Sequence, residues 1–578
     1  MRRNDMLKKG ATGVLVLTLA MSMILTGCGK SDKKTDSNTG NKTETTTAAQ
    51  EETTEKIEID GEEVPAQLQD KLNVIEDKNR NYYEIFVGSF YDSDGDGMGD
   101  LKGVIEKLDY INDGNPKTDT DMGYNGIWLM PINPSASYHK YDVKDYYGID
   151  SAYGTLDDFK QLIDECHKRN ITIIMDLVMN HSAIGHDWFK QARKYLQELP
   201  EGQEPNPADC KYVDYYTFVK TDDTLPSNYY PAGSSNYSYL GMFSQQMPDL
   251  NLDNPDVRKE FEDITKYWLD MGVDGFRLDA AKEFFSGETP HNVEVLKWFN
   301  SYVKSVNPNA YIVAETWASD YDKYLESGID SAFDFSYSGS DGELSHVVHG
   351  KDPVYNGEYF AECLKSSQER VLAANPEGIQ ACFLGNHDID RGTAFLAYNE
   401  NEVKFAQGLL SMMNGSTYIY YGDEIGLGGI GADENKRSPM IWSSTDTKGQ
   451  TNGPTNMSPA NVINKFGSVE EQQKDENSIL NYVKQGMKLR NIFPEIARGT
   501  IEVIDAGDEE IAAVSKTYNG SKIIILANCD KQNTKTVTLP RSEYGYTCIQ
   551  GELTVSKNQP YQVEDTIVLP PNAIVILK

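Results

Sequence analysis

The chain has 578 residues and carries a formal net charge of −35 at pH 7. Its length allows several domains and a large hydrophobic core. Because nucleic-acid binding needs a basic surface, the strong negative charge argues against a nucleic-acid partner. The 35 tyrosines and six tryptophans provide flat faces on which sugar rings can stack, although core packing is the commoner reason for such residues.

The N-terminus has the pattern of a secretory signal. An apolar segment, Ala11–Leu25, follows four cationic residues and is too short to span a membrane comfortably. Its end, Leu-Thr-Gly-Cys28, resembles a bacterial lipobox and predicts a lipoprotein signal peptide over residues 1–28 that is acylated at Cys28. The alternative is an ordinary signal peptide with an unrelated cysteine.

The segment that follows, residues 29–75, is rich in Ser, Thr, Lys and Glu and poor in large apolar side chains. Such a segment buries too little surface to fold, so it predicts a disordered tether. We therefore expect a globular body held by a lipid anchor at the extracellular face of the bacterial cell membrane.

Short apolar runs alternate with amphipathic stretches inside a predicted domain over residues 76–490. Alternating strands and helices predict a parallel sheet, and eight strands are the number that a (β/α)8 TIM barrel needs. The strand candidates are Tyr83–Val87, Gly126–Met130, Thr172–Leu177, Gly275–Leu278, Ala310–Ala314, Ser331–Phe335, Ala381–Leu384 and Ser416–Tyr420. The sequence therefore predicts an α/β fold built on this barrel.

Helix candidates lie between these runs and include Leu156–Arg169, Pro255–Met271 and Val293–Val306. Proline suits the first helical turn at position 255, with Asn254 or Asp253 as the N-cap. One connection, residues 182–250, is too long for a structureless loop in a compact domain. We expect it to form an inserted subdomain, the B subdomain, after the third strand.

The pattern changes again toward the C-terminus. Residues 491–578 contain β-like runs without a helical period, which predicts a small antiparallel β-sandwich domain. The clearest runs are Ile511–Tyr518, Lys522–Asn528, Lys535–Leu539 and Ile567–Lys578. Cys529 and Cys548 lie in neighbouring β-like segments, and both pairing and free thiols remain open.

Three carboxylates stand at the ends of apolar runs. Gly275-Phe-Arg-Leu-Asp279 places Arg277 and Asp279 on the same face of a strand, because side chains alternate faces. Glu315 follows the run that ends at Ala314, and Asp388 ends Phe383-Leu-Gly-Asn-His-Asp388. Carboxylates gathered at the mouth of a (β/α) barrel favour glycoside chemistry.

An Asp-rich loop follows the first predicted strand. It places Asp92, Asp94, Asp96 and Asp100 at alternate positions, with Met98 between the last two. Calcium prefers six to eight oxygen ligands, so four carboxylates and the Met98 carbonyl predict a structural Ca²⁺ site. The loop resembles the start of an EF-hand, but Gly103 stands where that motif has its Glu, and a solvated acidic turn is the alternative.

Together these segments resemble the α-amylase family of glycoside hydrolases, family 13. The resemblance covers about residues 80–445, and six motifs occur in the family's order. Met247-Pro-Asp-Leu-Asn251 resembles the group intermediate between oligo-1,6-glucosidases and neopullulanases. The six motifs begin at Gly123, Asp176, Gly275, Ala314, Phe383 and Gly422.

The resemblance implies roles for individual residues. Asp279 would be the nucleophile, Glu315 the general acid/base, and Asp388 a stabiliser that binds sugar hydroxyls. Substrate-binding residues would be Tyr141, which would stack on the glucose at the cleaved bond, together with His181, Arg277, Lys282 and His387. Arg277 would keep Asp279 ionised, and Asp388 would help to raise the pKa of Glu315.

Two departures from the family pattern matter for function. Many α-amylases have Lys-His where this chain has Lys282-Glu283, which weakens the case for the usual second calcium. The run Arg437-Ser-Pro-Met-Ile-Trp442 is similar to one found in α-glucosidases and their relatives.

We expect a monomeric endo-acting α-amylase that cuts α-1,4 bonds of starch and maltooligosaccharides with retention. An α-glucosidase, a neopullulanase-like hydrolase or a glucanotransferase of the same mechanism stays open. A non-catalytic surface glycan-binding protein is the alternative from another class.

Overall fold

The computed structural model describes residues 77–115, 117–118 and 120–578. The predicted signal peptide with Cys28 and the predicted tether over 29–75 lie outside the described residues. No helix within the described ranges combines the length and the apolar character that crossing a lipid bilayer requires.

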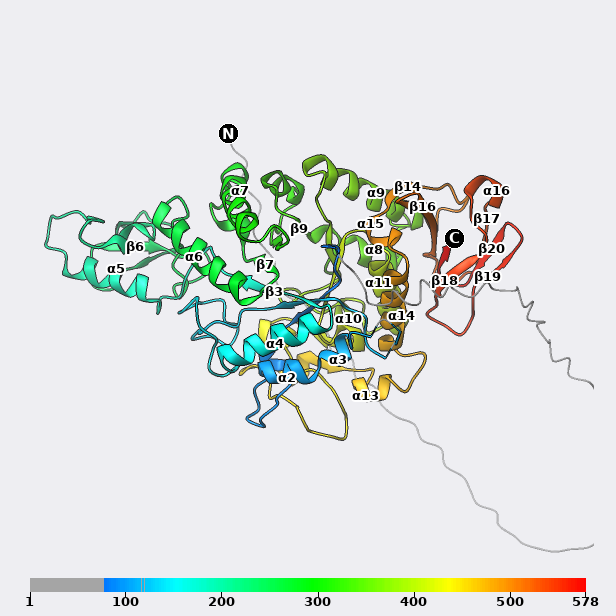
Figure 1. Cartoon of the computed structure of the whole chain (residues 1–578), viewed down its shortest axis with the longest axis horizontal. Helices are drawn as coiled ribbons and strands as arrows, with labels where there is room; N and C mark the ends of the chain where they lie inside the picture. The colour runs from blue at the N-terminus through cyan, green and yellow to red at the C-terminus, as the bar shows by residue number, and fades with distance from the viewer. Residues whose placement is uncertain (1–76, 116, 119) are drawn as a thin grey trace, which may run out of the picture. The chain divides into compact units, whose positions relative to one another are not determined.

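Eight parallel strands close into a barrel (Figure 1). They are β1 (Tyr82–Ile85), β2 (Gly126–Leu129), β3 (Thr172–Leu177), β7 (Gly275–Leu278), β8 (Tyr311–Ala314), β9 (Ser331–Asp334), β10 (Ala381–Phe383) and β11 (Ser416–Tyr420). The barrel closes where β1 pairs with β11, with Tyr82 opposite Tyr418. Each of the eight predicted runs overlaps one of these strands, so the predicted barrel is confirmed.

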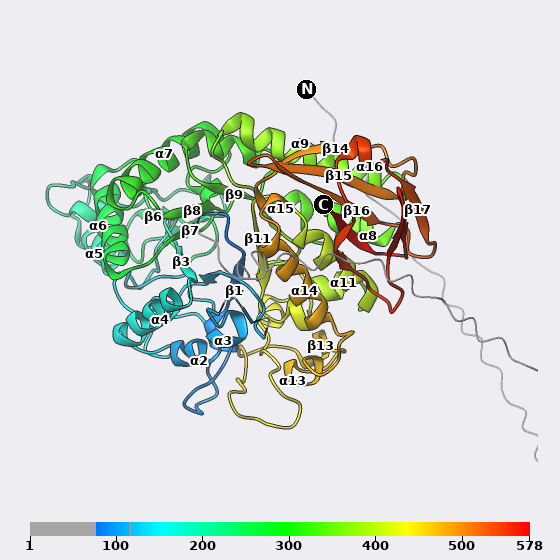
Figure 2. The ribbon, with the colours of Figure 1, turned by 45° about the vertical axis from the view of Figure 1, so that its right-hand side comes forward.

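Buried side chains fill the barrel and its outer layer. Strands of a parallel barrel are covered on both faces, which explains why they read as continuous apolar runs. Helices α4 (Leu156–Lys168), α6 (Pro255–Met271) and α7 (Thr289–Val306) lie close to their predicted bounds (Figure 2). Asn254, not Asp253, caps α6, because its side chain accepts the Asp256 N–H at 2.8 Å.

Residues 182–250 form a small folded insert. Helix α5 (Asp187–Glu198) packs on a three-stranded antiparallel sheet of β4 (Phe218–Lys220), β6 (Tyr237–Leu240) and β5 (Tyr229–Pro231). The ring of Phe189 on α5 lies 4.7 Å from that of Tyr239 on β6. The insert is therefore held by its own aromatic contacts, as expected of a subdomain and not of a loop.

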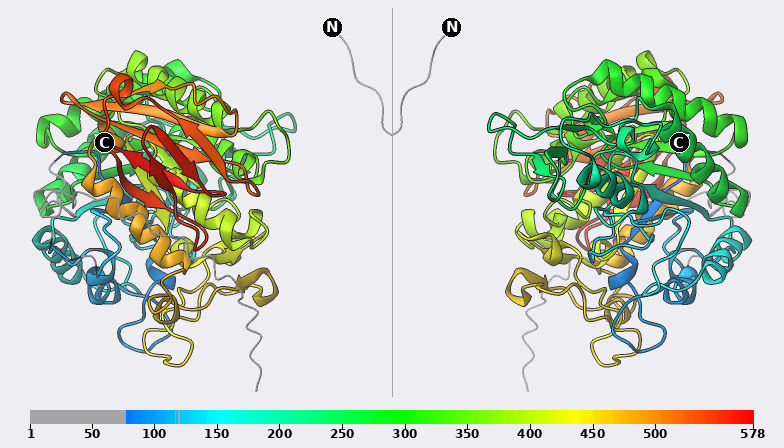
Figure 3. Two further views of the ribbon diagram at one scale, coloured as in Figure 1. Left: turned by 90° about the vertical axis from the view of Figure 1, so that its right-hand side faces the viewer. Right: turned by 90° about the vertical axis from the view of Figure 1, so that its left-hand side faces the viewer.

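The C-terminal region forms two antiparallel sheets (Figure 3). One sheet contains β14 (Thr500–Val503), β15 (Ile511–Tyr518), β16 (Ser521–Asn528), β21 (Ile574–Leu577) and β18 (Ile549–Leu553), and the other β17 (Lys535–Thr538), β20 (Thr566–Leu569) and β19 (Tyr561–Val563). Leu526 of the first sheet shares a buried cluster with Val537 and Leu569 of the second. The two sheets therefore enclose one core, as a sandwich does.

Two details of this region differ from the sequence expectation. The single run predicted over 567–578 is divided into β20 and β21, because Pro570 and Pro571 lack the N–H that a strand ladder needs. A one-turn helix, α16 (Arg541–Tyr544), lies where no helical period is visible, since one turn is too short to show one. Cys529 and Cys548 are both free thiols.

Two buried cations bond to the carbonyls of the segment before β11, and one of them comes from the C-terminal sheets. Arg490, on α14 (Ile479–Ile492), donates to the carbonyls of Ser411 and Gly415 at 3.0 and 2.5 Å. Lys516, on β15, donates to the carbonyl of Met412 at 2.7 Å. Burial lowers the pKa of Arg490 to about 9. These cations therefore satisfy backbone carbonyls that the fold would otherwise bury without partners.

Replacing Arg490 by Met should destabilise the protein, because the buried carbonyls of the 411–415 segment would lose their donors. Unsatisfied buried groups cost about 1–3 kcal/mol each, so we expect a loss of at least about 3 kcal/mol and a lower thermal midpoint. Lys484→Met, on the same helix but partly exposed, is the matched control. Equal thermal midpoints for the two variants would contradict this prediction.

Candidate active site

The three predicted acids lie at the carboxyl end of the barrel and line one pocket of about 380 Å³. Asp279 directly follows β7, Glu315 directly follows β8, and Asp388 lies in the loop after β10. Tyr141 and His181 line the same pocket. In parallel barrels this end carries the loops that bear function, so the placement fits an active site.

A single buried guanidinium links the carboxylates. Arg277 Nη1 lies 2.7 Å from Asp279 Oδ1 and 2.8 Å from Asp176 Oδ1, and its Nη2 lies 3.0 Å from Glu315 Oε2. Burial by itself would lower the pKa of Arg277, but attraction to Asp176 and Glu315 keeps that pKa well above its usual value. One planar fork therefore fixes Asp279 and Glu315 side by side.

Asp176 is a site residue to which the sequence gives no role. It lies near the end of β3, and its second oxygen accepts the Tyr141 hydroxyl at 3.0 Å. Burial raises the pKa of Asp176 to about 7, with Asp279 adding to the rise and Arg277 opposing it. The feature of the sequence that could have identified Asp176 is an acid inside the otherwise apolar strand Ile-Ile-Met-Asp-Leu.

Glu315 occupies an environment that favours its protonated form. Burial raises the pKa of Glu315 and the charges of Asp279 and Asp388 add to this, while Arg277 opposes it. The backbone N–H of Ala280 donates to Glu315 Oε2 at 2.8 Å. Ala280 has a φ of 47°, a left-handed conformation that is uncommon for a residue with a β-carbon. The strained turn thus aims its N–H at the second acid.

Asp388 is held between two cations. His387 Nε2 lies 3.0 Å from Asp388 Oδ2, and Arg437 Nη2 lies 3.1 Å from Asp388 Oδ1. Burial alone would raise the pKa of Asp388, but His387 and Arg437 bring it well below its usual range. The pKa of His387 rises to about 9, because Asp388 and Glu84 outweigh the effect of burial. Asp388 is therefore an ionised acceptor.

The remaining predicted residues differ in position. The Tyr141 hydroxyl lies 2.7 Å from His387 Nε2. His181 is buried, its Nε2 has no hydrogen-bond partner among the described residues, and burial lowers its pKa. Lys282 is not among the residues that line the pocket, and its amine lies 3.6 Å from Glu283. Of the predicted substrate-binding residues, Tyr141 and His181 therefore line the pocket, and Arg277 and His387 lie behind it against the acids. Lys282 does neither.

Several pocket residues are not singled out by the sequence. Phe243 and Trp317 line it and are each 50% exposed, and His139 and Asp433 line its wall near Arg437. Phe243 belongs to the insert, whose aromatic residues can either pack the core of the insert or line the pocket. The sequence does not distinguish these two positions. Trp317 follows Glu315 by two residues, which is the signal that could have identified it.

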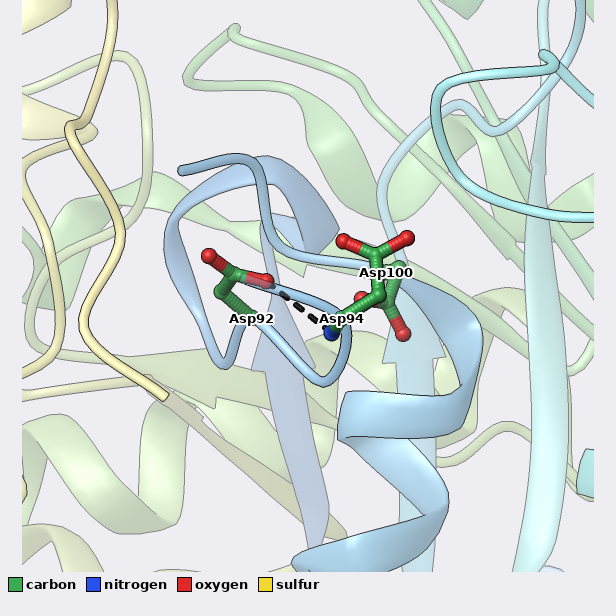
Figure 4. A group of neighbouring side chains, drawn as sticks. All are labelled: Asp92, Asp94 and Asp100. Carbon is green, nitrogen blue, oxygen red and sulfur yellow. Dashed lines mark hydrogen bonds between the residues drawn. The ribbon is translucent and has the colours of Figure 1, made fainter. Parts of the chain in front are cut away.

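The Asp-rich loop brings together part of the predicted metal site (Figure 4). Asp92, Asp94 and Asp100 each offer an oxygen within 4.8 Å of the others. Asp96 lies outside this group, and its carboxylate accepts the Met98 N–H at 2.7 Å. None of the ion pairs within the described ranges joins these acids to Lys or Arg. Their oxygen-only set fits a hard divalent cation.

A parallel barrel with a guanidinium-linked pair of acids at its carboxyl end fits the two-carboxyl chemistry of a glycoside hydrolase. The family model for the α-amylase catalytic domain matches residues 84–499. The chain belongs to this family, so the resemblance found in its motifs is confirmed.

The matching proteins include α-amylases and an oligo-1,6-glucosidase. α-Amylase 3 of Dictyoglomus thermophilum is 36% identical over 87% of this chain and 93% of its own length. An oligo-1,6-glucosidase of Parageobacillus thermoglucosidasius is 29% identical over 79% of this chain and 91% of its own. The solved structure of Eubacterium rectale Amy13B is 40% identical with a TM-score of 0.82, over 89% of this chain and 98% of its own.

The ion pair of His387 should make stability depend on pH. The folded pKa of about 9 exceeds the ordinary value of about 6.5, so the stabilisation is fully present below pH 6.5 and is lost as the pH rises through 9. We expect the thermal midpoint of the wild type minus that of His387→Gln to shrink between pH 6.5 and 9.5.

The comparison needs a variant that lies away from this network and removes no titratable group. Gln485→Ala, at an exposed position of helix α14, should give a difference that does not change with pH over the same range. A difference for His387→Gln that stays constant or grows as the pH rises would contradict the prediction.

Proposed function

We propose that this protein is an α-amylase that hydrolyses internal α-1,4-glucosidic bonds of starch and maltodextrins with retention of configuration. The observation that carries the proposal is the contact of Arg277 with both Asp279 and Glu315. A retaining glycosidase needs two neighbouring carboxyls, one ionised and one protonated. The relative named α-amylase 3 supports this choice of activity.

In the proposed first step, Asp279 attacks the anomeric carbon while Glu315 gives its proton to the departing glycosidic oxygen. A covalent bond forms between the sugar and Asp279, and the leaving chain departs as an alcohol. In the second step Glu315 takes a proton from water, which attacks the same carbon and releases Asp279. Arg277 holds the nucleophile from a distance of 2.7 Å, and burial favours the protonated form of Glu315.

The substrate glucose is held by the surrounding groups. Asp388 accepts from sugar hydroxyls, His181 and His387 contact them, and Tyr141 stacks on the ring. An ionised Asp388 also opposes the positive charge that develops on the sugar in the transition state. Lys282, predicted to contact the sugar beyond the cut, has no such role in this proposal, because its amine lies 3.6 Å from Glu283 and contacts none of the three acids.

The aromatic rim favours a substrate of several glucose units. Trp317 lines the pocket and also a second cavity of about 410 Å³, where Phe335 stacks on it with ring centroids 4.7 Å apart. A second cavity that meets the pocket at Trp317 supports endo-hydrolysis, because it offers room for further sugars beside the cleaved bond. The relative named oligo-1,6-glucosidase and the Arg437 motif favour the second candidate, an α-glucosidase, neopullulanase-like hydrolase or glucanotransferase.

We also propose that a structural Ca²⁺ binds Asp92, Asp94 and Asp100 and joins the loop after β1 to residues 449–452. The Asp92 N–H donates to Gly449 O at 3.0 Å, and the Asn452 N–H donates to Gly97 O at 2.8 Å. The ion takes no part in the reaction. The lipobox ending at Cys28 supports an enzyme anchored at the extracellular face of the cell membrane.

Product analysis on maltoheptaose tests the proposed reaction. The wild type should release maltooligosaccharides of intermediate length early, and Asp279→Asn should lower kcat by roughly 10³-fold or more because the nucleophile is lost. Asp274→Asn, the same change at the opposite end of β7, is the control. Glucose as the only product would indicate exo-hydrolysis, and products longer than maltoheptaose would indicate transfer. If the folded wild type released no products, the protein would be a glycan-binding protein and not a hydrolase.

Removal of calcium should lower stability. A ligand that binds only the folded state stabilises it by mass action, so a chelator should lower the thermal midpoint of the wild type by several degrees. Asp94→Asn should weaken this response, whereas Asp96→Asn, outside the carboxylate group, should keep it. A wild type that is indifferent to the chelator would rule out the site.

A further inference from the structure

His387 carries a carboxylate on each of its ring nitrogens. Its Nδ1 lies 2.5 Å from Glu84 Oε1 on β1, and its Nε2 lies 3.0 Å from Asp388 Oδ2. The imidazole is fully buried, and Glu84 is 1% exposed. A neutral imidazole has one N–H, so it can donate to only one of the two acids. His387 Nε2 also lies 2.7 Å from the hydroxyl of Tyr141, which donates its own hydrogen to Asp176. Each ring nitrogen therefore faces acceptors, and only the protonated ring offers an N–H on both sides.

The other groups around His387 are compatible with a cation there. Tyr141 stacks on it at 5.6 Å, and the rings of Trp128 and Tyr420 lie 5.6 and 6.4 Å away, so its walls are aromatic. Burial raises the pKa of Asp176 and that of Glu84, and the charge of His387 opposes both rises. Arg277 opposes them as well. The charged and titratable neighbours are therefore Glu84, Asp388, Asp176, Arg277, Tyr141 and Tyr420.

We propose that Glu84 is a positioning residue for the reaction: its carboxylate holds His387 as an imidazolium whose Nε2–H always faces Asp388 and the bound sugar. A protonated ring has no lone pair, so it acts only as a hydrogen-bond donor to the sugar hydroxyl. Its charge also keeps Asp388 ionised beside the reacting sugar. Glu84 reaches the substrate only through His387.

Glu84 is buried where burial alone disfavours a charged side chain. Burial raises the pKa of Glu84, and His387 opposes that rise. The structure thus places an acid inside the barrel whose only side-chain hydrogen-bond partner within the described ranges is His387. The strand needs no acid at this position to pair, since β1 joins β2 and β11 through its backbone. Because His387 is this partner, we assign Glu84 the role of holding His387.

The direct test is the titration of ¹⁵N-labelled His387 by NMR in the full chain, with His387→Gln to assign its signals. In the wild type both ring nitrogens should carry protons at pH 7.5. Glu84→Gln keeps a hydrogen-bond acceptor and removes only the charge, so it should lower the pKa of His387 by about one to three units. Glu424→Gln, an equally buried acid bonded to Tyr83 and Tyr110, should leave it unchanged.

The kinetic consequence rests on the proposed function and is measured separately. With α-maltosyl fluoride the leaving group needs no proton from Glu315, so the alkaline loss of kcat/KM reports other groups. Its midpoint should move to lower pH in Glu84→Gln by the same amount as the pKa of His387.

The outcomes separate the two ideas. A neutral His387 in the wild type at pH 7.5, or an unchanged pKa in folded Glu84→Gln, would overturn the role of Glu84 whatever the activity. An inactive wild type with a protonated His387 would instead overturn the proposed function and leave the ion pair standing.

Discussion

The site depends on one buried guanidinium. Arg277 is 1% exposed and contacts Asp176, Asp279 and Glu315 through two of its nitrogens. Burying a cation is costly unless charged hydrogen bonds replace its water, and burying these acids near one another is costly without a cation. Each group therefore needs the others, and the planar fork sets where the two reacting carboxyls lie.

A second cluster repeats this arrangement across the barrel mouth. His387 and Arg437 hold Asp388, and Glu84 holds His387 from the other side. Both clusters pair acids with cations inside an aromatic enclosure, where electrostatic interactions are stronger than in water. The barrel supplies the rigidity for the first cluster, since Asp279 and Glu315 directly follow the neighbouring strands β7 and β8. Asp388 lies in a loop and is fixed there by His387 and Arg437.

The parts outside the barrel complete the site. The insert supplies Phe243 to one rim of the pocket, and the loop after β8 supplies Trp317. The C-terminal sheets lie away from the chemistry and share buried cations with the barrel, as Lys516 shows by donating to the carbonyls of Met412 and Ile496. We infer that their contribution is to stability.

The sequence by itself determined the barrel strands, the family and the three acids, because apolar runs and the strand-end position of each acid are local properties of the chain. It also predicted the contact of Arg277 with Asp279, since residues two apart on a strand share a face. Only the tertiary structure decided which residues contact Glu84 and Asp176. It also decided that Asp96 lies outside the carboxylate group, that Lys282 lies away from the acids, and that Phe243 lines the pocket. These depend on which distant side chains meet when the barrel closes, and spacing along the chain does not encode that.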